Sequence, residues 1–264
     1  MKELLLRTLT GIALVVLVAG SILLGPYSLL AITLLLYVLS ILELKALFNK
    51  VKRRKIWFQS LPGFILLPLT FAFFEYSLLL AWLIIPAALW LFAILRWGIN
   101  LPGLLSFLWL ALPYSSFLAL GWMSGDNGYQ SILPLSVIAL VWVNDTFAYL
   151  TGSLVGRHQM TPVLSPGKTW EGFAGGVIFT LLATWITWRL TGILGQGTWL
   201  SIALIVSLLG LAGDLFESGL KRTIKVKNAG RLLPGHGGVL DRFDSLLFVA
   251  PAVVILILLI KLLL

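Results

Sequence analysis

Long apolar stretches follow one another along almost the whole chain, and they restrict its fold more than any other feature. A helix needs about 20 apolar residues to cross the roughly 30 Å hydrocarbon layer of a bilayer. Stretches close to that length lie near 8–24, 27–48, 57–74, 77–96, 101–122, 131–151, 171–190, 199–217 and 246–263. Hydrophobic residues make up 59% of the sequence and charged residues 11%, which excludes a water-soluble fold. We therefore expect an all-α, polytopic integral membrane helical bundle with about nine transmembrane helices.

Basic residues predict how this bundle is oriented, because cytoplasmic loops of membrane proteins carry an excess of Lys and Arg. With the N-terminus inside, one side of the membrane receives the basic residues of 50–55, Arg96, Arg157, Lys168 and the segment 218–245, and the other side little more than Arg189 and Lys261. We expect an integral protein of the cytoplasmic (inner) membrane, with its N-terminus and active site facing the cytoplasm. This topology accounts for much of the formal charge of +9 without a nucleic acid partner.

A single integral membrane domain is expected over 1–264. Its character changes near position 125, because the spans before it carry few ionisable residues and most of the acids follow it. We therefore expect a mainly hydrophobic scaffold at 1–124 and a catalytic half at 125–264. Only Glu75 and Tyr76 separate the third and fourth stretches, so the boundary between these two spans is the least defined.

Acidic residues lie at or inside the ends of three apolar spans in the second half. They are Asp145, the pair Asp214 and Glu217, and the pair Asp241 and Asp244. An ionised carboxylate in hydrocarbon costs about 2.5–3.5 kcal/mol even on the lenient insertion scale. These acids therefore require cationic partners or a wet cavity, and they mark the place where function is expected.

Helical spacing brings several of these groups onto one helix face. The residues of that face are Asp214, Glu217, Ser218 and Lys221. Asp241 and Asp244 share a face in the same way if the last helix begins near them. Clustered carboxylates repel one another, and a divalent cation such as Mg²⁺ would relieve the repulsion, because it binds a few carboxylate oxygens together with waters and substrate phosphates.

Interfacial ion pairs are the alternative interpretation of the same acids. In that arrangement Asp241 pairs with Arg242 or Lys221, and Glu217 pairs with Arg222.

Two glycine-bearing loops could supply contacts to phosphate. In 164–176, a Pro-Gly turn presents Lys168 and Thr169 just before a span, so that backbone N–H groups and the positive helix end can face an anion. In the second loop, Gly235, Gly237 and Gly238 flank His236 and allow the backbone to approach a ligand closely. Ordinary turns between helices remain the alternative for both loops.

The segment from Ser218 to Asp244, SGLKRTIKVKNAGRLLPGHGGVLDRFD, closely resembles the signature of the phosphatidate cytidylyltransferases, also called CDP-diacylglycerol synthases. The resemblance extends upstream through NDTFAYLTGSLVGR, SPGKTWEG and GDLFES, so it covers roughly the second half of the chain. The pattern is long and spaced, and it is therefore specific. The chain departs from it at three positions: Asn228 replaces a usual Asp, Phe147 a frequent Gly, and Gly167 a frequent Lys.

The resemblance implies that CTP and phosphatidic acid condense to CDP-diacylglycerol and pyrophosphate, with Mg²⁺ and a monovalent cation, K⁺, as cofactors. The attacking lipid phosphate has a second pKa of about 6 and is already largely ionised at neutral pH, so the main obstacle is the encounter of two anions. We accordingly expect metal ligands at Asp145, Asp214, Asp241 and Asp244. The expected catalytic set is Asp145, Lys168, Asp214, Ser218, Lys221, Arg222, His236, Asp241, Arg242 and Asp244. The expected substrate contacts are Ser165, Lys168, Thr169, Glu171, Lys221, Arg222, Lys227, Gly235, His236, Gly237 and Gly238.

Two other functions fit parts of the pattern. A related membrane nucleotidyltransferase or kinase could act on another lipid, such as an isoprenoid phosphate or dolichol. A transporter coupled to cations or protons would instead disperse its acids through the membrane depth and break its helices near midspan. We also expect a homodimer associated through small-residue helix faces.

Overall fold

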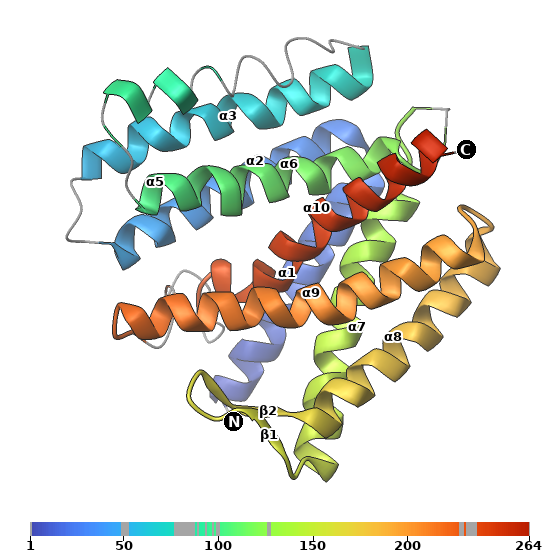
Figure 1. Cartoon of the computed structure of the whole chain (residues 1–264). Coiled ribbons are helices and arrows are strands. Elements are labelled where there is room, and N and C mark those ends of the chain that lie inside the picture. The colour runs from blue at the N-terminus through green and yellow to red at the C-terminus, as the bar shows by residue number, and fades with distance from the viewer. Residues whose placement is uncertain are drawn as a thin grey trace.

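The computed structural model describes residues 2–48, 53–76, 88, 90–92, 94–96, 98, 101–125, 128–226, 230 and 237–263. The expected fourth span at 77–96 therefore lies largely outside the described residues. Helices make up most of what is described (Figure 1). They are α1 (Lys2–Leu24), α2 (Pro26–Leu47), α3 (Arg53–Tyr76), α5 (Leu101–Leu105), α6 (Leu112–Ala119), α7 (Ile132–Val155), α8 (Trp170–Thr191), α9 (Gln196–Thr223) and α10 (Leu240–Leu263). A π-helical turn, η1 (Ser106–Ala111), joins α5 to α6, and a 3₁₀ turn, η2 (Leu120–Trp122), follows α6.

Six segments of the described chain are helical, long and apolar enough to cross a membrane. They are α2, the continuous segment from α5 to η2, α7, α8, α9 and α10. The apolar parts of α1 and α3 are shorter, at Thr8–Leu24 and Ser60–Phe74. The structure thus agrees with a polytopic helical membrane protein, whereas the expected count of about nine spans is not confirmed within the described ranges.

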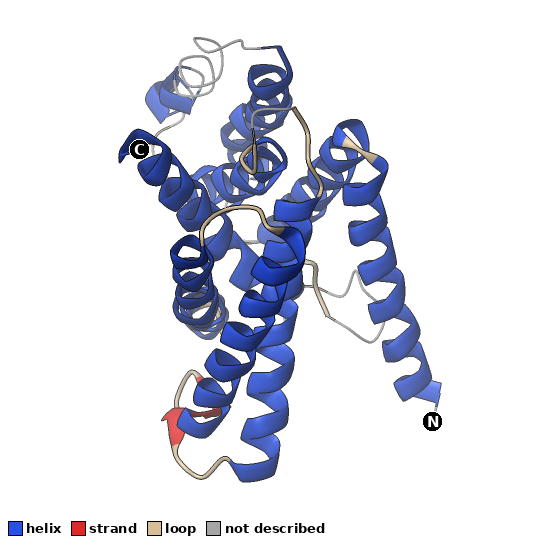
Figure 2. Ribbon diagram, turned by 90° about the vertical axis from the view of Figure 1, so that its right-hand side faces the viewer, coloured by secondary structure: helices blue, strands red, loops and turns tan. Residues whose placement is uncertain are grey.

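A small β-hairpin between α7 and α8 departs from the expected all-α fold. Its strands are β1 (Gln159–Thr161) and β2 (Ser165–Thr169), which pair antiparallel with Gln159 opposite Thr169. The hairpin lies between two apolar helices, at the end of the bundle that also holds the N-terminus (Figures 1 and 2). Strand pairing satisfies backbone groups of this connection that no helix takes up. Thr169 then ends β2 and caps α8, because its hydroxyl accepts a hydrogen bond from Gly172 N at 3.1 Å.

Glycines on α8 allow close packing of α7 against α8, which run side by side in both views (Figures 1 and 2). A Cβ on Gly172 would lie 2.7 Å from the Ala148 carbonyl oxygen, and one on Gly176 would lie 3.0 Å from Asn144 Oδ1. Small residues let membrane helices approach in this way. On α9, a Cβ on Gly213 would collide with the carbonyl oxygen of Asp244 in α10. These contacts bring the polar residues of α7, α9 and α10 together.

The first half of the chain packs around buried tyrosines. Tyr37 of α2 and Tyr114 of α6 are both fully buried. The Tyr37 hydroxyl donates to the Ser60 carbonyl oxygen of α3 at 2.8 Å, and Ser40 Oγ lies 2.8 Å from the Tyr114 hydroxyl. Such hydrogen bonds satisfy polar groups that would otherwise be costly in an apolar interior, and they tie α2, α3 and α6 into one layer.

Candidate functional site

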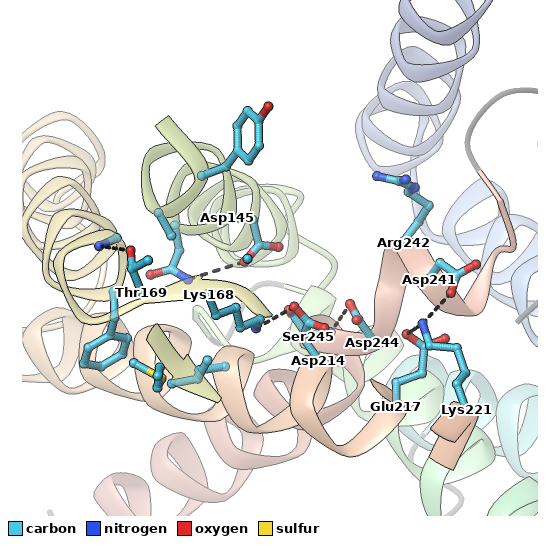
Figure 3. Close-up of a pocket in the computed structure, with 18 residues that line it drawn as sticks. Asp145, Lys168, Thr169, Asp214, Glu217, Lys221, Asp241, Arg242, Asp244 and Ser245 are labelled. Carbon is cyan, nitrogen blue, oxygen red and sulfur yellow. Dashed lines mark hydrogen bonds and ion pairs between the residues drawn. The ribbon is translucent and has the colours of Figure 1, made fainter. Parts of the chain in front are cut away.

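A cavity of about 450 Å³ lies between α7, the hairpin, α8, α9 and the start of α10 (Figure 3). Five carboxylates and three cationic side chains line it, together with backbone and apolar atoms. Eight of the residues expected from the sequence are among its lining: Asp145, Lys168, Thr169, Asp214, Lys221, Asp241, Arg242 and Asp244. Residues that are nearly 100 positions apart in the chain therefore face one space.

The last turns of α9 carry an acid, a second acid and a lysine on one face, as helical spacing predicts. Asp214, Glu217 and Lys221 all line the cavity. Lys221 Nζ lies 3.0 Å from Glu217 Oε2 and 2.7 Å from Asp241 Oδ1. Ion pairs of the alternative interpretation are thus present, although Glu217 pairs with Lys221 rather than Arg222. Glu217 is only 1% exposed, and its second oxygen, Oε1, has no hydrogen-bond partner among the described residues.

Lys168 reaches the cavity from the hairpin. Its Nζ lies 2.5 Å from Asp214 Oδ2, so the end of β2 is joined to the face of α9. Asp214 Oδ1 also accepts a hydrogen bond from Ser218 Oγ, at 3.2 Å. The cap formed by Thr169 holds the backbone directly after Lys168, which sets where this lysine emerges.

Asp145 faces the cavity from α7 and is oriented by neighbours on two helices. Asn144 Nδ2 donates to Asp145 Oδ1 at 3.4 Å, and Thr180 of α8 donates to Asn144 Oδ1 at 3.3 Å. Asn144 and Thr180 are buried. The close approach of α7 and α8 thus supports the position of this carboxylate.

Asp241 and Asp244 lie in the first turns of α10, which begins at Leu240 rather than near 246. Asp241 Oδ2 accepts the N–H of Gly238 at 2.8 Å. Gly237 precedes it with a φ of 84°, a backbone conformation that suits glycine. Asp244 is 8% exposed, and its Oδ1 accepts the N–H of Ser245 at 2.7 Å. Both carboxylates line the cavity, in agreement with the expected shared helix face.

The cavity suits a hard divalent cation in its chemistry, because its donors are carboxylate oxygens and one of them, Glu217 Oε1, is buried without a described partner. No three His, Cys, Asp or Glu side chains of the described chain converge closely enough to hold a metal ion. Lys168 and Lys221 lie between the acids instead, as Figure 3 shows. The carboxylates thus share one cavity, and Lys168 and Lys221 neutralise part of their charge.

Several expected site residues do not line the cavity. Glu171 instead accepts hydrogen bonds from Arg157 N at 3.1 Å and His158 N at 3.2 Å. Its Oε1 also lies 2.5 Å from His158 Nδ1, so the carboxylate holds the backbone just before the hairpin. Ser165 lies in β2, where its carbonyl accepts from Thr161 Oγ1. Other expected residues outside the lining are Ser218, exposed Arg222, Gly237 and Gly238. Lys227, Gly235 and His236, with the departure Asn228, lie outside the described residues.

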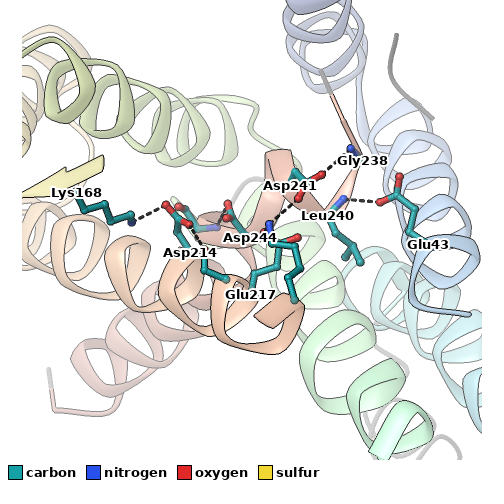
Figure 4. Close-up of polar contacts among 11 residues, drawn as sticks. Glu43, Lys168, Asp214, Glu217, Gly238, Leu240, Asp241 and Asp244 are labelled. Atoms are coloured by element: carbon teal, nitrogen blue, oxygen red, sulfur yellow. Dashed lines mark hydrogen bonds and ion pairs between the residues drawn. The ribbon is translucent and has the colours of Figure 1, made fainter. Parts of the chain in front are cut away.

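Sequence reasoning missed a buried acid in the first half of the chain. Glu43 of α2 accepts the N–H groups of Val239 at 2.8 Å and Leu240 at 2.9 Å, next to the acidic cavity (Figure 4). A lone acid inside an otherwise apolar span is itself a sign of function, and Glu43 carried that signal.

Two departures from the family pattern have local explanations. Phe147 of α7 stacks on Phe179 of α8, with ring centroids 3.8 Å apart, so the larger side chain adds to helix packing. Gly167 lines the cavity, and a Cβ built on it would meet no atom within 4 Å. The missing lysine therefore leaves open space beside Lys168.

Comparisons with known proteins give a consistent result. The model of the Cytidylyltransferase family matches residues 5–260. A protein of Staphylococcus saprophyticus named phosphatidate cytidylyltransferase is 36% identical over 267 residues, which cover 95% of this chain and 98% of that protein. A protein of the same name from Staphylococcus epidermidis is 33% identical over 276 residues with the same coverage. One from Staphylococcus aureus is 47% identical over 125 residues, or 47% of this chain and 48% of that protein.

Proposed function

The chain belongs to the Cytidylyltransferase family, and we propose that it condenses CTP with phosphatidic acid to CDP-diacylglycerol and pyrophosphate in phospholipid biosynthesis. The observation that carries this proposal is the cavity in which five carboxylates meet Lys168, Lys221 and Arg242 at the ends of apolar helices. Such a site suits a reaction between a soluble nucleotide and a lipid phosphate, because both substrates are anions and one of them is held by the bilayer.

The transfer forms one bond and breaks another. An oxygen of the lipid phosphate attacks the α-phosphorus of CTP, and the bond from that phosphorus to the oxygen bridging to the β-phosphorus breaks. Pyrophosphate leaves with the electron pair. The lipid phosphate is already ionised, so the protein has to overcome charge repulsion rather than remove a proton. Positioning and electrostatic stabilisation therefore supply most of the rate acceleration, as in other phosphoryl transfers.

Three cations of the cavity suit this task. We assign Lys168 and Lys221 to the phosphate oxygens of the substrates, with Arg242 beside them. Both lysines are held by acids within 3.0 Å, so their ammonium groups are positioned before a substrate arrives. Arg222 is exposed away from the cavity lining, and its expected catalytic role, like those of Ser218, Lys227 and His236, remains a prediction.

Charge balance in the cavity supports a magnesium requirement. Five carboxylates against three cationic side chains leave a formal charge of two negative units, which one divalent cation would neutralise. We propose that one or two of the predicted ligands Asp145, Asp214, Asp241 and Asp244 would hold Mg²⁺ together with substrate phosphates, since no three acids of the described chain converge on one point. The bound ion would supply Lewis-acid stabilisation of charge on the phosphate oxygens. The monovalent cation implied by the resemblance is assigned to no particular residue.

The membrane setting of the reaction follows from the charge distribution. We propose that the site faces the cytoplasm from the inner membrane, with the N-terminus on the same side, because CTP is a soluble nucleotide and the basic loops predict this orientation. The hairpin that carries Lys168 lies at the same end of the bundle as the N-terminus, which agrees with that topology (Figures 1 and 2). A homodimer remains part of the proposal, and size-exclusion chromatography with light scattering would test it.

Labelled nucleotides separate this function from its alternatives. Purified protein in phosphatidic acid micelles with Mg²⁺ should transfer label from [α-³²P]CTP to lipid and none from [γ-³²P]CTP. Transfer of the γ-label would instead identify a lipid kinase. Polyprenyl phosphate in place of phosphatidic acid tests the lipid class, and EDTA tests the metal. Absence of α-label from phosphatidic acid in the presence of Mg²⁺, or labelling of polyprenyl phosphate alone, would refute the proposal.

A further inference from the structure

Glu43 contacts the start of α10 from a helix that belongs to the other half of the chain. Its two carboxylate oxygens each accept one backbone N–H, that of Val239 at 2.8 Å and that of Leu240 at 2.9 Å. Glu43 is 2% exposed. The first N–H groups of a helix lack partners within the helix, and the positive helix end favours an anion. Glu43 therefore caps α10 from nearly 200 positions away in the sequence.

The position of Glu43 on its own helix does not explain its presence. It lies near the C-terminal end of α2, where the helix dipole disfavours a negative charge. A buried carboxylate at that place needs strong partners, and the N-terminus of α10 provides them. The Glu43 carboxylate thus stabilises the start of α10 rather than its own helix, α2.

Two glycines leave the space that this carboxylate occupies. A Cβ on Gly238 would lie 2.6 Å from Glu43 Oε2, and a Cβ on Gly230 would collide with Glu43 Oε1. Both glycines belong to the polar segment between α9 and α10. These two described residues of the segment therefore pack directly on Glu43.

The contact continues into the acidic cavity through consecutive hydrogen bonds (Figure 4). Gly238, whose neighbour Val239 is bound by Glu43, donates its own N–H to Asp241 at 2.8 Å. Asp241 in turn accepts from Lys221 at 2.7 Å. Glu43 itself is not part of the cavity lining. Its effect on substrates must therefore pass through the start of α10.

We propose that Glu43 is a positioning residue for the cytidylyl transfer, which places Asp241 and Asp244 against α9 by holding the first backbone N–H groups of α10. The inference rests on the proposed function. Loss of the Glu43 carboxylate frees two backbone N–H groups and lets the first turn of α10 shift. Misplacement of catalytic groups by about 1 Å can cost roughly 100-fold in rate.

Glu43→Gln tests this role with nearly unchanged side-chain shape. One amide oxygen can still accept an N–H, but the amide NH₂ is a donor and faces the second N–H group. We expect kcat to fall at least about tenfold, with little change in the KM for phosphatidic acid, because Glu43 does not line the cavity. Glu43→Asp keeps the charge with a shorter reach and should recover part of kcat. Gly238→Ala should reproduce the loss, because its methyl group would displace the same carboxylate.

Ser40→Ala is the matched control for a structural effect alone. Ser40 lies one turn before Glu43 on α2, is equally buried, and has its hydrogen bond with Tyr114 of α6 rather than with α10. It should lower the unfolding temperature and leave kcat near the wild-type value. A second readout without turnover is hydrogen–deuterium exchange over 237–247. Glu43→Gln should accelerate exchange there, and Ser40→Ala should not.

The outcomes separate the two proposals. Inactive wild-type protein would overturn the proposed function and the positioning role with it. An active wild type with an equally active Glu43→Gln variant would overturn the positioning role alone. The same conclusion would follow if Glu43→Gln lost no more kcat than Ser40→Ala, or if exchange over 237–247 were unchanged.

Discussion

Lys221 forms ion pairs with two carboxylates of the site, and its replacement by Met gives a quantitative test of the structure. Its Nζ lies within 3.0 Å of two carboxylates, Glu217 and Asp241. The three side chains are 12%, 1% and 14% exposed, respectively. Met preserves most of the length and apolar stem of the lysine and removes the charge together with the N–H donors. The substitution thus leaves two largely buried carboxylates without their shared cation.

The expected cost follows from burial. Removing one partner of a buried ion pair typically destabilises a protein by about 3–5 kcal/mol. We expect a value near the lower end, about 3 kcal/mol, because Asp241 borders a cavity that water can enter. Glu217 Oε1 has no hydrogen-bond partner among the described residues, so the loss of Lys221 removes the hydrogen bond that the structure gives to the other oxygen, Oε2. A loss of this size is large against a typical total stability of about 5–15 kcal/mol.

Denaturant unfolding in detergent, followed by tryptophan fluorescence, measures this loss. Lys261→Met is the matched control, because Lys261 is exposed at the far end of α10 and its loss should leave the unfolding midpoint near that of the wild type. The double variant Glu217→Gln/Lys221→Met should be more stable than the sum of the single effects predicts, by roughly 0.5–3 kcal/mol. Strict additivity of the two substitutions, or a wild-type midpoint for Lys221→Met, would refute the buried ion-pair network.

Two further substitutions probe the chemistry of the cavity. Asp244→Asn keeps the oxygen that accepts the Ser245 N–H, so the helical circular dichroism spectrum should persist. Turnover should fall at least about 100-fold because a metal ligand is lost, and near-normal turnover would contradict the assignment. Gly167→Lys places a second cation beside Lys168 in open space and should lower the KM for CTP by about two- to fivefold. The neutral Gly167→Gln should not lower it, and equal KM values for the two variants would exclude an electrostatic effect.

The helices and much of the cavity were predictable because their signals are local. Runs of about 20 apolar residues identify spans without knowledge of their neighbours. The intervals between Asp214, Glu217 and Lys221 likewise place them on one face of any helix, and these residues do line one cavity. Helix ends were less predictable. The apolar run stops near 217, but α9 continues to Thr223, because its polar last turns still make helical hydrogen bonds beyond the apolar part.

The hairpin and the contact of Glu43 depend on tertiary structure, and for that reason the sequence did not reveal them. Strands of three and five residues produce too short a pattern to distinguish from a turn. Glu171 shows a related difficulty, since its place in a conspicuous motif suggested substrate binding, whereas its carboxylate binds the backbone at Arg157 and His158. A motif indicates that residues matter together, but it does not separate ligand contacts from groups that hold the loop.

Glu43 also changes how the two halves of the chain relate. A purely hydrophobic scaffold would stabilise the second half through apolar contacts, which are non-directional and would tolerate a small slide of α10. Two backbone N–H groups donate to one carboxylate, and these hydrogen bonds fix both the height and the rotation of the first turn of α10, because each requires a defined N–H direction. The same turn presents Asp241 and Asp244 to the cavity. The geometry of the acidic site therefore depends on a residue of α2, and exchanging α2 for another apolar helix should preserve membrane insertion while impairing turnover.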